Sequence, residues 1–360
     1  MYLAVALSGG LDSLAALLRL KKAGHKLLAL HATFWPSQDD LPKKLGELVA
    51  KLGITYYAIN LEQEFAKEVL SPSLKLWQEG ATPNPCAFCN EKLKFGYLWH
   101  FAKSQGCLAL ATGHYASLKQ AYGTLLLAPP KDLSKDQSYF LSHLEPQVLP
   151  NLNFPLANFT KDENRALLKS EGLSPICPKE SQDLCFLPND KEERNKALLN
   201  LFRQAGYPQP KQGPIEIFDQ GQLKQSKLPH QGLWRYTEGQ RKGLGISSDN
   251  GLYVLKKDYP RQTLIIGPKN LLGLKKLVAK DPHFFCPRSA WPTQVLAKVR
   301  LSQKPCQAKV VQKDPMTLEV SFAEKILPTA KGQLLSITDQ AGHILAGALI
   351  EETENIDCQI

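Results

Sequence analysis

The sequence predicts an α/β protein with an N-terminal parallel sheet covered by helices, a small central β-rich domain and a C-terminal β-barrel. Three observations carry this prediction. Strand-like and helix-like segments alternate up to about residue 150, short β-like runs with turn residues follow Gly206, and apolar and polar residues alternate from Leu277 to Ile360. The first pattern is typical of parallel sheets and the other two of antiparallel sheets or barrels. We expect domains at residues 1–205, 206–272 and 273–360, in keeping with a chain too long for one average domain.

A glycine turn follows the first predicted strand. An apolar run from Tyr2 to Leu7 leads into the motif SGGLDS (residues 8–13), and a helical stretch runs from Leu14 to Ala23. Two adjacent glycines let backbone N–H groups point inward, the serines add hydroxyl donors, and a helix N-terminus attracts anions. The motif therefore predicts a phosphate-binding loop. The alternative is an ordinary glycine turn between strand and helix.

The other elements of the first domain follow from apolar runs and helical spacing. Strands are expected at residues 26–34, 55–60 and 107–112, and a helix at 41–52. The motif ATGHY (residues 111–115) directly follows a strand, as SGGLDS does. Ligands of such sheets bind at the C-terminal strand ends, so we expect both loops to face one pocket. Strands are expected again at residues 251–255 and 263–267.

Composition limits the classes of function. The chain is 43% hydrophobic without a long apolar segment, and it starts with a strand rather than a basic leader, so we expect a cytoplasmic protein and no membrane partner. Eight cysteines in 360 residues do not suggest a disulfide scaffold. A formal net charge of +10 exceeds what a nucleotide needs and suggests nucleic acid as a partner.

The segment TPNPCAFCN (residues 82–90) presents Cys86 and Cys89 at the start of a helix that also carries Lys92 and Lys94. A helix N-terminus with nearby lysines is expected to favour thiolate, the form that attacks or binds a metal. The alternative is half of a structural zinc site, which would need a second close cysteine pair. Cys177 and Cys185 are eight residues apart and do not form one.

Several other residues and segments have more than one possible role. Cys185 follows polar residues and is not expected to be a buried spacer, whereas Cys107 lies in an apolar strand and is expected in the core. The run KDQSYFL (residues 135–141) suits either a helix cap or phosphate and ribose contacts. The basic, glycine-rich loop at residues 236–245 suits an RNA backbone, or is a surface hairpin. His114 is expected to contact substrate rather than metal.

The remaining cysteines are taken as structural: Cys177, Cys286, Cys306 and Cys358.

Together these segments resemble the tRNA-specific 2-thiouridylases, a family of PP-loop ATP pyrophosphatases, over nearly the full length of the chain. SGGLDS alone would indicate the superfamily, but its combination with TPNPC-x-x-C-N and SQD-x-C-F is highly specific. The matching motifs are SGGLDS, TPNPCAFCNEKLKF, ATGHYA, KDQSYFL, SQDLCF, YTEGQRKGLGI and the tripeptide at residues 331–333.

The resemblance implies ATP-dependent 2-thiolation of the wobble uridine, position 34, of tRNA. ATP and Mg²⁺ would bind at the PP-loop, with Asp12 on the side of the loop that faces Mg²⁺. The uridine 2-carbonyl oxygen would then be adenylated. Cys185 would carry sulfur as a persulfide, and Cys89 would act as the nucleophile that releases it, forming a transient disulfide with Cys185. The nucleotide-contacting residues implied are Ala6, Leu7, Ser8, Gly9, Gly10, Leu11, Asp12, Ser13, Ala32 and Gly113.

The resemblance also implies the partners. tRNAs of the Lys, Glu and Gln types would be substrates, and a sulfur donor protein or sulfide would supply sulfur. Leu301 stands where relatives more often carry Tyr. The implied tRNA contacts are Asn84, Pro85, Cys86, His114, Lys135, Asp136, Gln137, Arg300, Leu301 and Gln333.

Cys86 occupies a position where family members carry either Asp or Cys, and this opens an alternative. Cys86, Cys89 and Cys185 together could hold a [4Fe-4S] cluster with one iron open to sulfide. Two other functions stay open on the residues alone. A different PP-loop ligase or amidotransferase would explain the loop but not the cysteines, and a non-catalytic RNA-binding protein would leave Ser8, Asp12 and Ser13 without a use.

Overall fold

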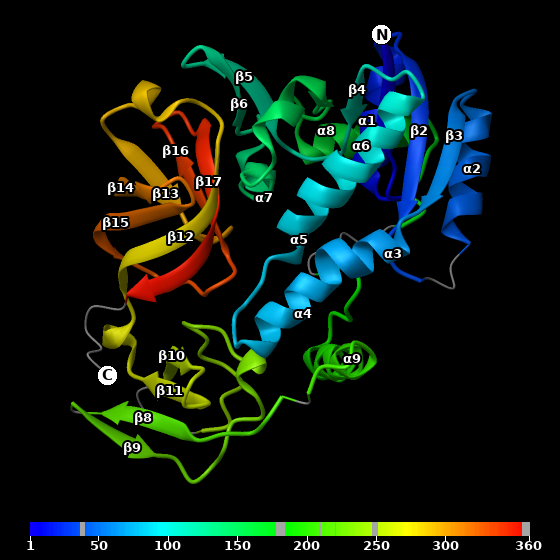
Figure 1. Ribbon diagram of the computed structural model, residues 1–360. Coiled ribbons are helices and arrows are strands. Elements are labelled where there is room, and N and C mark those ends of the chain that lie inside the picture. The colour runs from blue at the N-terminus through cyan, green and yellow to red at the C-terminus, as the bar shows by residue number, and fades with distance from the viewer. Residues whose placement is uncertain (37–39, 178–183, 209, 220, 247–250, 355–360) are drawn as a thin grey trace.

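The computed structural model describes residues 1–36, 40–177, 184–208, 210–219, 221–246 and 251–354 (Figure 1). Its N-terminal domain is built on a five-stranded sheet of order β3-β2-β1-β4-β7, in which every pair of neighbours is parallel. The sheet strands are β1 (Tyr2–Ala6), β2 (Lys26–Thr33), β3 (Thr55–Asn60), β4 (Ala109–Ala111) and β7 (Leu152–Asn153), and a separate hairpin comprises β5 (Ser117–Ala121) and β6 (Thr124–Ala128).

Two long helical segments of this domain change their hydrogen bonding midway. One comprises α3 (Glu62–Phe65), a π-helical stretch (Ala66–Leu70) and α4 (Ser71–Gln78); the other comprises α5 (Pro85–Phe88), a π-helical stretch (Cys89–Leu98) and α6 (Trp99–Ser104). The remaining α-helices are α1 (Leu11–Lys22), α2 (Leu41–Lys51), α7 (Ser138–Leu141), α8 (Lys161–Ser170) and α9 (Lys191–Gln204). Short 3₁₀ turns lie at Leu133–Lys135, Pro146–Asn151, Leu233–Arg235, Lys269–Leu271 and Arg288–Ala290.

The predicted α/β class is confirmed, with small differences at the ends of elements. The strand expected at residues 107–112 contains only Ala109–Ala111, because the backbone of β1 pairs with it only from Leu3 to Val5. The first helix begins at Leu11, three residues before its apolar run. The glycine turn is therefore shorter than the sequence pattern suggested, and Asp12 lies in the first helical turn.

The central domain holds a four-stranded sheet of order β10-β11-β8-β9. Its strands are β8 (Ile215–Asp219), β9 (Gln222–Gln225), β10 (Tyr253–Asp258) and β11 (Thr263–Gly267). β11 and β8 run parallel, and the other neighbours are antiparallel. β10 begins two residues later than the expected run at 251–255 and extends further, while the expected strand at 263–267 coincides with β11.

The C-terminal strands close into an antiparallel barrel of order β12-β15-β14-β13-β16-β17, as expected. Closure removes unpaired sheet edges, which are otherwise open to pairing with other chains. The strands are β12 (Leu274–Phe284), β13 (Val295–Lys298), β14 (Cys306–Asp314), β15 (Thr317–Ile326), β16 (Leu334–Thr338) and β17 (Ile344–Glu354). In the described part of the chain, no helix is both long and apolar enough to cross a membrane.

The barrel packs tightly against the N-terminal domain. One cluster of buried apolar residues runs from the sheet, through the helix that carries Phe95 and Trp99, into the barrel interior at Leu277 and Val320. Gly347 on β17 has no room for a Cβ, since that atom would overlap the backbone of Ser142 in the N-terminal domain. A continuous core of this kind fixes the barrel relative to the parallel sheet.

Candidate active site

The predicted phosphate loop closes on itself between β1 and α1. The Ser13 hydroxyl accepts a hydrogen bond from the Ser8 N–H at 3.2 Å and donates to the Gly10 carbonyl at 3.0 Å. Gly9 has φ +82°, and a Cβ there would lie 2.9 Å from the Leu41 side chain. The positive φ is the main reason for a glycine here, since the Leu41 methyl is the end of a flexible side chain that can move aside. The loop thus leaves the N–H groups at the start of α1 in position for an anion.

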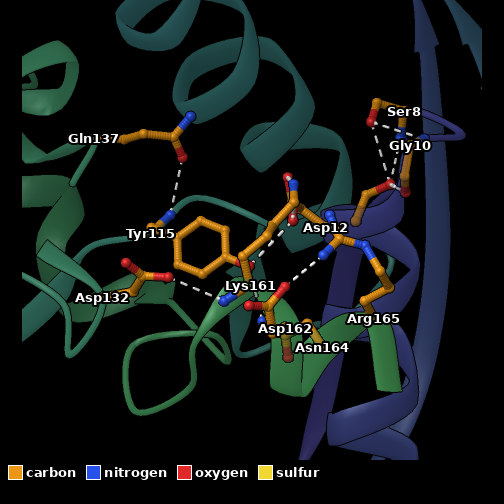
Figure 2. Close-up of polar contacts among 11 residues, drawn as sticks. Ser8, Gly10, Asp12, Tyr115, Asp132, Gln137, Lys161, Asp162, Asn164 and Arg165 are labelled. Atoms are coloured by element: carbon orange, nitrogen blue, oxygen red, sulfur yellow. Dashed lines mark hydrogen bonds and ion pairs between the residues drawn. The ribbon is translucent and has the colours of Figure 1, made fainter. Parts of the chain in front are cut away.

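Asp12 is held by a polar network that the sequence did not reveal (Figure 2). Both of its carboxylate oxygens accept from the Lys161 Nζ at 2.7 Å, and the Tyr115 hydroxyl donates to one of them at 3.2 Å. Asn164 donates in turn to the Tyr115 oxygen at 2.8 Å. Burial raises the pKa of Tyr115, so the phenol stays protonated and able to donate at neutral pH.

Lys161 is buried at the first position of α8, and its backbone N–H is bound by Asp132 at 3.0 Å. The sequence marks this helix start through Thr160 and Glu163, which form a capping box. Nothing in the local pattern indicates that a lysine 149 residues away faces Asp12. Only the folded chain brings the two charges together.

The loop after β4 lies directly against the phosphate loop. A Cβ at Gly113 would be 2.7 Å from the backbone of Asp12 and Ser13, so glycine is required for this approach. His114 is half-buried, and its Nδ1 lies 2.8 Å from the Thr112 hydroxyl. Burial, aided by the charge of Lys94, lowers the pKa of His114 well below its usual value, so the ring is neutral at pH 7.

The KDQ residues support this loop from the other side. The side-chain oxygen of Gln137 accepts a hydrogen bond from the Tyr115 backbone N–H at 2.9 Å. The Gln137 backbone N–H donates to the Tyr115 carbonyl at the same distance. Asp136 accepts from the Ser138 N–H at 2.9 Å, and Lys135 ends a 3₁₀ turn. Gln137 is therefore linked to Asp12 through Tyr115. Ala6 ends β1 next to β2, which carries Ala32, and Leu7 follows β1 and donates its N–H to the Leu30 carbonyl at 2.7 Å.

The three cysteines singled out from the sequence lie in the same part of the N-terminal domain. Asn84 caps the helix by accepting from the Ala87 N–H at 3.3 Å, and Pro85 opens it. Cys89 is buried in an apolar cluster that also contains Phe186, the neighbour of the exposed Cys185. Charge on Cys185 would raise the pKa of both Cys86 and Cys89, so its thiol lies within electrostatic range of theirs. Residues 178–183, including most of the SQDLCF motif's polar part, lie outside the described residues.

The prediction that Cys86 and Cys89 favour thiolate is wrong. Burial raises the pKa of Cys89 to about 12 and also raises the pKa of Cys86. The ammonium of Lys94 lowers the pKa of both thiols but does not outweigh desolvation. The π-helical stretch begins at Cys89 itself, and such stretches often occur at functional sites.

Residues from all three domains meet at Thr82, just before the first of these cysteines. The Thr82 N–H donates to the Lys331 carbonyl at 2.8 Å, and the Gln333 amide donates to the Thr82 carbonyl at 2.7 Å. From the central domain, Lys257 donates to the Thr82 hydroxyl at 3.1 Å. We call these contacts the Thr82 junction. Gln333, predicted from the resemblance to contact tRNA, holds this segment in the structure.

Arg300 also connects two domains. Its guanidinium donates to the Glu238 carbonyl at 2.7 Å, within the loop at residues 236–245, and the neighbouring Leu301 is 45% exposed. In that loop Tyr236 is buried, whereas Arg241 and Lys242 are exposed. The loop therefore combines interdomain contacts with an exposed basic end.

Of the remaining cysteines, four lie within the described residues. Cys107 and Cys286 are buried, as expected for the first, and Cys306 is half-buried. Cys177 donates its backbone N–H to the Gly9 carbonyl at 2.9 Å and so lies against the phosphate loop. Cys358 lies outside the described residues.

A glycine–serine loop that closes on a helix N-terminus at the C-terminal edge of a parallel sheet defines a PP-loop protein of the α/β class. Three family models match successive parts of the chain: "tRNA methyl transferase HUP domain" at residues 1–189, "tRNA methyl transferase PRC-barrel domain" at 205–268 and "Aminomethyltransferase beta-barrel domain" at 274–350.

Curated relatives are similar over almost the whole chain. The tRNA-specific 2-thiouridylase MnmA of Nitratidesulfovibrio vulgaris (Miyazaki F strain) is 38% identical over 359 residues, covering 97% of this chain and 99% of the relative. The enzyme of the same name from Aquifex aeolicus is 32% identical over 371 residues, covering 98% and 99%. The chain belongs to the family of tRNA-specific 2-thiouridylases.

One solved structure, the U34-tRNA thiolase NcsA from Methanococcus maripaludis with its [4Fe-4S] cluster, is 17% identical with a TM-score of 0.35. The match covers 57% of this chain and 66% of that one. A likeness this low carries no argument about the site.

Proposed function

We propose that this chain catalyses the ATP-dependent 2-thiolation of uridine 34 in tRNA. Membership of the 2-thiouridylase family supports the reaction. The observation that carries the proposal is that the cysteines at residues 86, 89 and 185 gather in the domain that holds the phosphate loop. Substrate tRNAs would be those of the Lys, Glu and Gln types, and the formal charge of +10 suits a polyanionic partner. We place the enzyme in the cytoplasm.

The phosphate loop would bind ATP during the first step. The uridine 2-carbonyl oxygen attacks the α-phosphorus, the bond to the β-phosphate oxygen breaks, and pyrophosphate leaves. N–H groups at the start of α1 would stabilise the charge on the phosphates, together with the hydroxyls of Ser8 and Ser13.

Mg²⁺ would neutralise phosphate charge when it is bound. Asp12 fits this role in its donor chemistry, since Mg²⁺ is usually held by one or two carboxylates and the substrate phosphates. Both oxygens of Asp12 are bound by Lys161 in the structure. Lys161 would therefore have to share or release one oxygen, and its ammonium would then face the same phosphates.

Cys185 would deliver sulfur in the second step. The Cys185 thiolate first takes the outer sulfur of a persulfide on a donor protein, which leaves as a thiol, and the terminal sulfur of the resulting Cys185 persulfide attacks C2 of the activated uridine while AMP departs with the oxygen. The Cys89 thiolate then attacks the sulfur of Cys185, so that a Cys89–Cys185 disulfide forms and the thiocarbonyl is released. A thiol reductant must restore both cysteines. Because burial raises the pKa of Cys89, a base or a shift of the helix must help to deprotonate it.

A second candidate keeps the reaction and changes the sulfur carrier. Cys86 would supply the third ligand of a cluster with one open iron. Among the described residues these three thiols do not lie close enough to one another to share an ion, so a cluster would require them to move closer. Iron analysis after anaerobic purification separates the two. A colourless, iron-free and fully active enzyme excludes the cluster.

Other functions leave part of the molecule unused. Methyl transfer, which two family descriptions name, has no use for three gathered cysteines. A small-molecule PP-loop ligase or amidotransferase would use neither the cysteines nor the basic loop at 236–245. A non-catalytic RNA-binding protein would not need the closed loop between Ser8 and Ser13.

Mass spectrometry of tRNA treated with enzyme, ATP and a sulfur donor tests the proposal. We expect one uridine to gain sulfur, with tRNA-dependent AMP release. Cys185→Ala should abolish thiolation while tRNA binding stays nearly unchanged, and Cys306→Ala is the matched control with wild-type yield. Normal product from the Cys185→Ala enzyme would refute the sulfur route, and no AMP release from the wild type would refute the reaction.

A further inference from the structure

A surface cleft on the barrel lies outside the proposed active site. Its floor is formed by β13, β14 and β15, and its wall by Arg288 and the segment that leads into β13. The cleft has a volume of about 610 Å³, which is within the range of about 300–1,000 Å³ typical of ligand sites. β14 and β15 lie on the side of the barrel remote from the parallel sheet (Figure 1). The lining contains none of the described residues assigned above to ATP binding or sulfur transfer.

The register of the strands places polar side chains on the floor of the cleft. Ala308 pairs with Phe322, and Lys309 pairs with Ser321. Side chains along a strand alternate between its two faces, and Ala308 and Phe322 are buried in the barrel core. Lys309 is exposed on the outer face, which Gln307 shares. The floor therefore offers an ammonium, a hydroxyl and an amide group to a ligand.

The wall of the cleft contains a stacked pair of a tryptophan and an arginine. The guanidinium carbon of Arg288 lies 4.0 Å from the centroid of the Trp291 ring. The Trp291 Nε1–H donates to the Cys286 carbonyl at 3.4 Å, and the Arg288 Nη2–H donates to the Val310 carbonyl. These contacts hold both groups in place before a ligand binds, which lowers the entropy cost of stacking on them.

The cations of the cleft lack negative partners. Within the described part of the chain, neither Arg288 nor Lys309 forms an ion pair, and no carboxylate lines the cleft. Burial alone lowers the pKa of Arg288, because no charged neighbour contributes to the shift. On the same face of β15, Glu319 is paired with Lys313 at 3.3 Å. A half-buried guanidinium and an ammonium without negative partners favour an anionic ligand.

Together these groups match the parts of a nucleotide. Aromatic rings and guanidinium planes stack on bases, and cations bind phosphates. Amide and hydroxyl groups form hydrogen bonds with base edges, sugars or phosphates. An acidic peptide would use the two cations but would leave the stacked surface without a partner. A free adenine nucleotide already has a site at the phosphate loop. The combination therefore favours a nucleotide that is part of an RNA.

One strand connects the cleft with the tRNA contact predicted at Arg300. β13 begins beside the cleft at Val295 and ends at Lys298, two residues before Arg300. From Thr293 to Arg300 the chain spans at most about 23 Å, at about 3.3 Å per residue. About seven nucleotides stacked at about 3.4 Å each cover a similar distance. An RNA that contacts Arg300 can therefore also reach the cleft.

We propose that this cleft binds one nucleotide of the substrate tRNA, at a position other than the uridine that is thiolated. The base stacks on the pair formed by Arg288 and Trp291, and Lys309 binds the phosphate. The inference rests on the proposed function, because it takes tRNA to be the substrate. It adds a contact on the barrel that increases the affinity for tRNA and takes no part in the transfer of sulfur.

Fluorescence-anisotropy titration of the full-length enzyme with a labelled tRNA of the Lys type tests this inference. Lys309→Gln should weaken binding about three- to tenfold at about 0.1 M salt. It should also lower the slope of log Kd against log salt by about 0.7–1, as the loss of one phosphate contact does. Trp291→Leu should weaken binding about 5- to 100-fold through the loss of one stacked base. Lys313→Gln, on the same strand and with its charge already paired, is the matched control and should bind as the wild type does.

Ultraviolet cross-linking locates the contact. Mass spectrometry should find a nucleotide adduct on the peptide that contains Trp291, and excess unlabelled tRNA should remove this adduct whereas excess AMP should not. Because Lys309 is exposed, Lys309→Gln decides the question even if Trp291→Leu does not fold.

Three results would overturn the inference: tRNA affinities of the folded cleft variants equal to that of Lys313→Gln, no adduct on this peptide, or loss of the adduct with AMP, which would assign the cleft to a free nucleotide. Any of them together with normal thiolation by the wild type would refute the cleft alone. A wild type that binds no tRNA would refute the cleft and the proposed function together.

Discussion

Asp12 illustrates how a residue identified from a local motif depends on a distant partner. Its carboxylate lies in the first turn of α1, where the helix dipole favours a negative charge, and Lys161 binds both of its oxygens at 2.7 Å. The side chain of Lys161 is buried and that of Asp12 is one-third exposed. The pair therefore positions the carboxylate at the phosphate loop while part of it stays accessible.

Replacing Lys161 should reduce both stability and adenylation. Lys161→Met removes two charged hydrogen bonds from Asp12 and should lower the free energy of unfolding by about 1–3 kcal/mol in urea titrations. Misplacement of the carboxylate should slow tRNA-dependent AMP release roughly tenfold or more. Lys131→Met, which breaks an exposed pair with Glu163 in the same helix, should cost about 0–1 kcal/mol and leave AMP release unchanged. Equal effects of the two substitutions would contradict a specific role for Lys161.

At the scale of elements, the helical segment from Pro85 to Ser104 controls the reactivity of the cysteines. It carries Cys86 and Cys89 near its start and Lys94 further along, within the π-helical stretch. Burial raises the pKa of Cys89 to about 12, and Lys94 partly opposes this. The thiolate fraction at neutral pH is therefore small, and the position of this lysine on the helix determines how small.

Alkylation of Cys89 should show this balance through its pH dependence. Only the thiolate reacts, so below a pKa of about 12 the rate should rise close to tenfold per pH unit and still be rising at pH 10. Lys94→Gln removes a charge that lowers the pKa and should slow alkylation at every pH in this range, whereas Lys94→Arg should not. Peptide mass spectrometry after timed iodoacetamide treatment measures the rates. A plateau for Cys89 near pH 8 would show that its pKa is not raised.

The same elements show what a sequence can predict about this fold. Short-range patterns were sufficient for the parallel sheet, the closed loop at Ser8–Ser13 and the barrel, because each depends on periodicity or on adjacent residues. Contacts between distant segments were not predictable. Lys161 meets Asp12 across 149 residues, and Lys257 meets Thr82 across 175. The wrong prediction of a thiolate at Cys89 has the same origin. The lysine that lowers its pKa can be read from the sequence, whereas the burial that raises it cannot.

At the scale of the whole molecule, the Thr82 junction links the cysteine-bearing helix to both other domains. The barrel contributes the Lys331 carbonyl and the Gln333 amide, and the central domain contributes Lys257, which also donates to the Tyr236 carbonyl at 3.0 Å. Burial lowers the pKa of Lys257, and the charge of Glu238 opposes this shift. These hydrogen bonds tie the segment just before the helix that holds Cys86 and Cys89 to both other domains.

Gln333→Ala should loosen this junction without unfolding the chain. It removes the donor to the Thr82 carbonyl, and a single neutral hydrogen bond contributes about 0.5–1.5 kcal/mol. The amide of Thr82, bound to the Lys331 carbonyl, should then exchange its hydrogen several-fold faster, because local opening costs less. Hydrogen–deuterium exchange of a peptide spanning residues 78–88 measures this, with Gln303→Ala, a barrel glutamine outside the junction, as the matched control. Unchanged exchange in Gln333→Ala would mean that the Gln333 side chain does not hold this segment, and that it serves only the tRNA contact predicted for it. Faster exchange together with a slower thiolation rate would instead indicate that the contact between Gln333 and Thr82 helps to position the cysteines for the reaction.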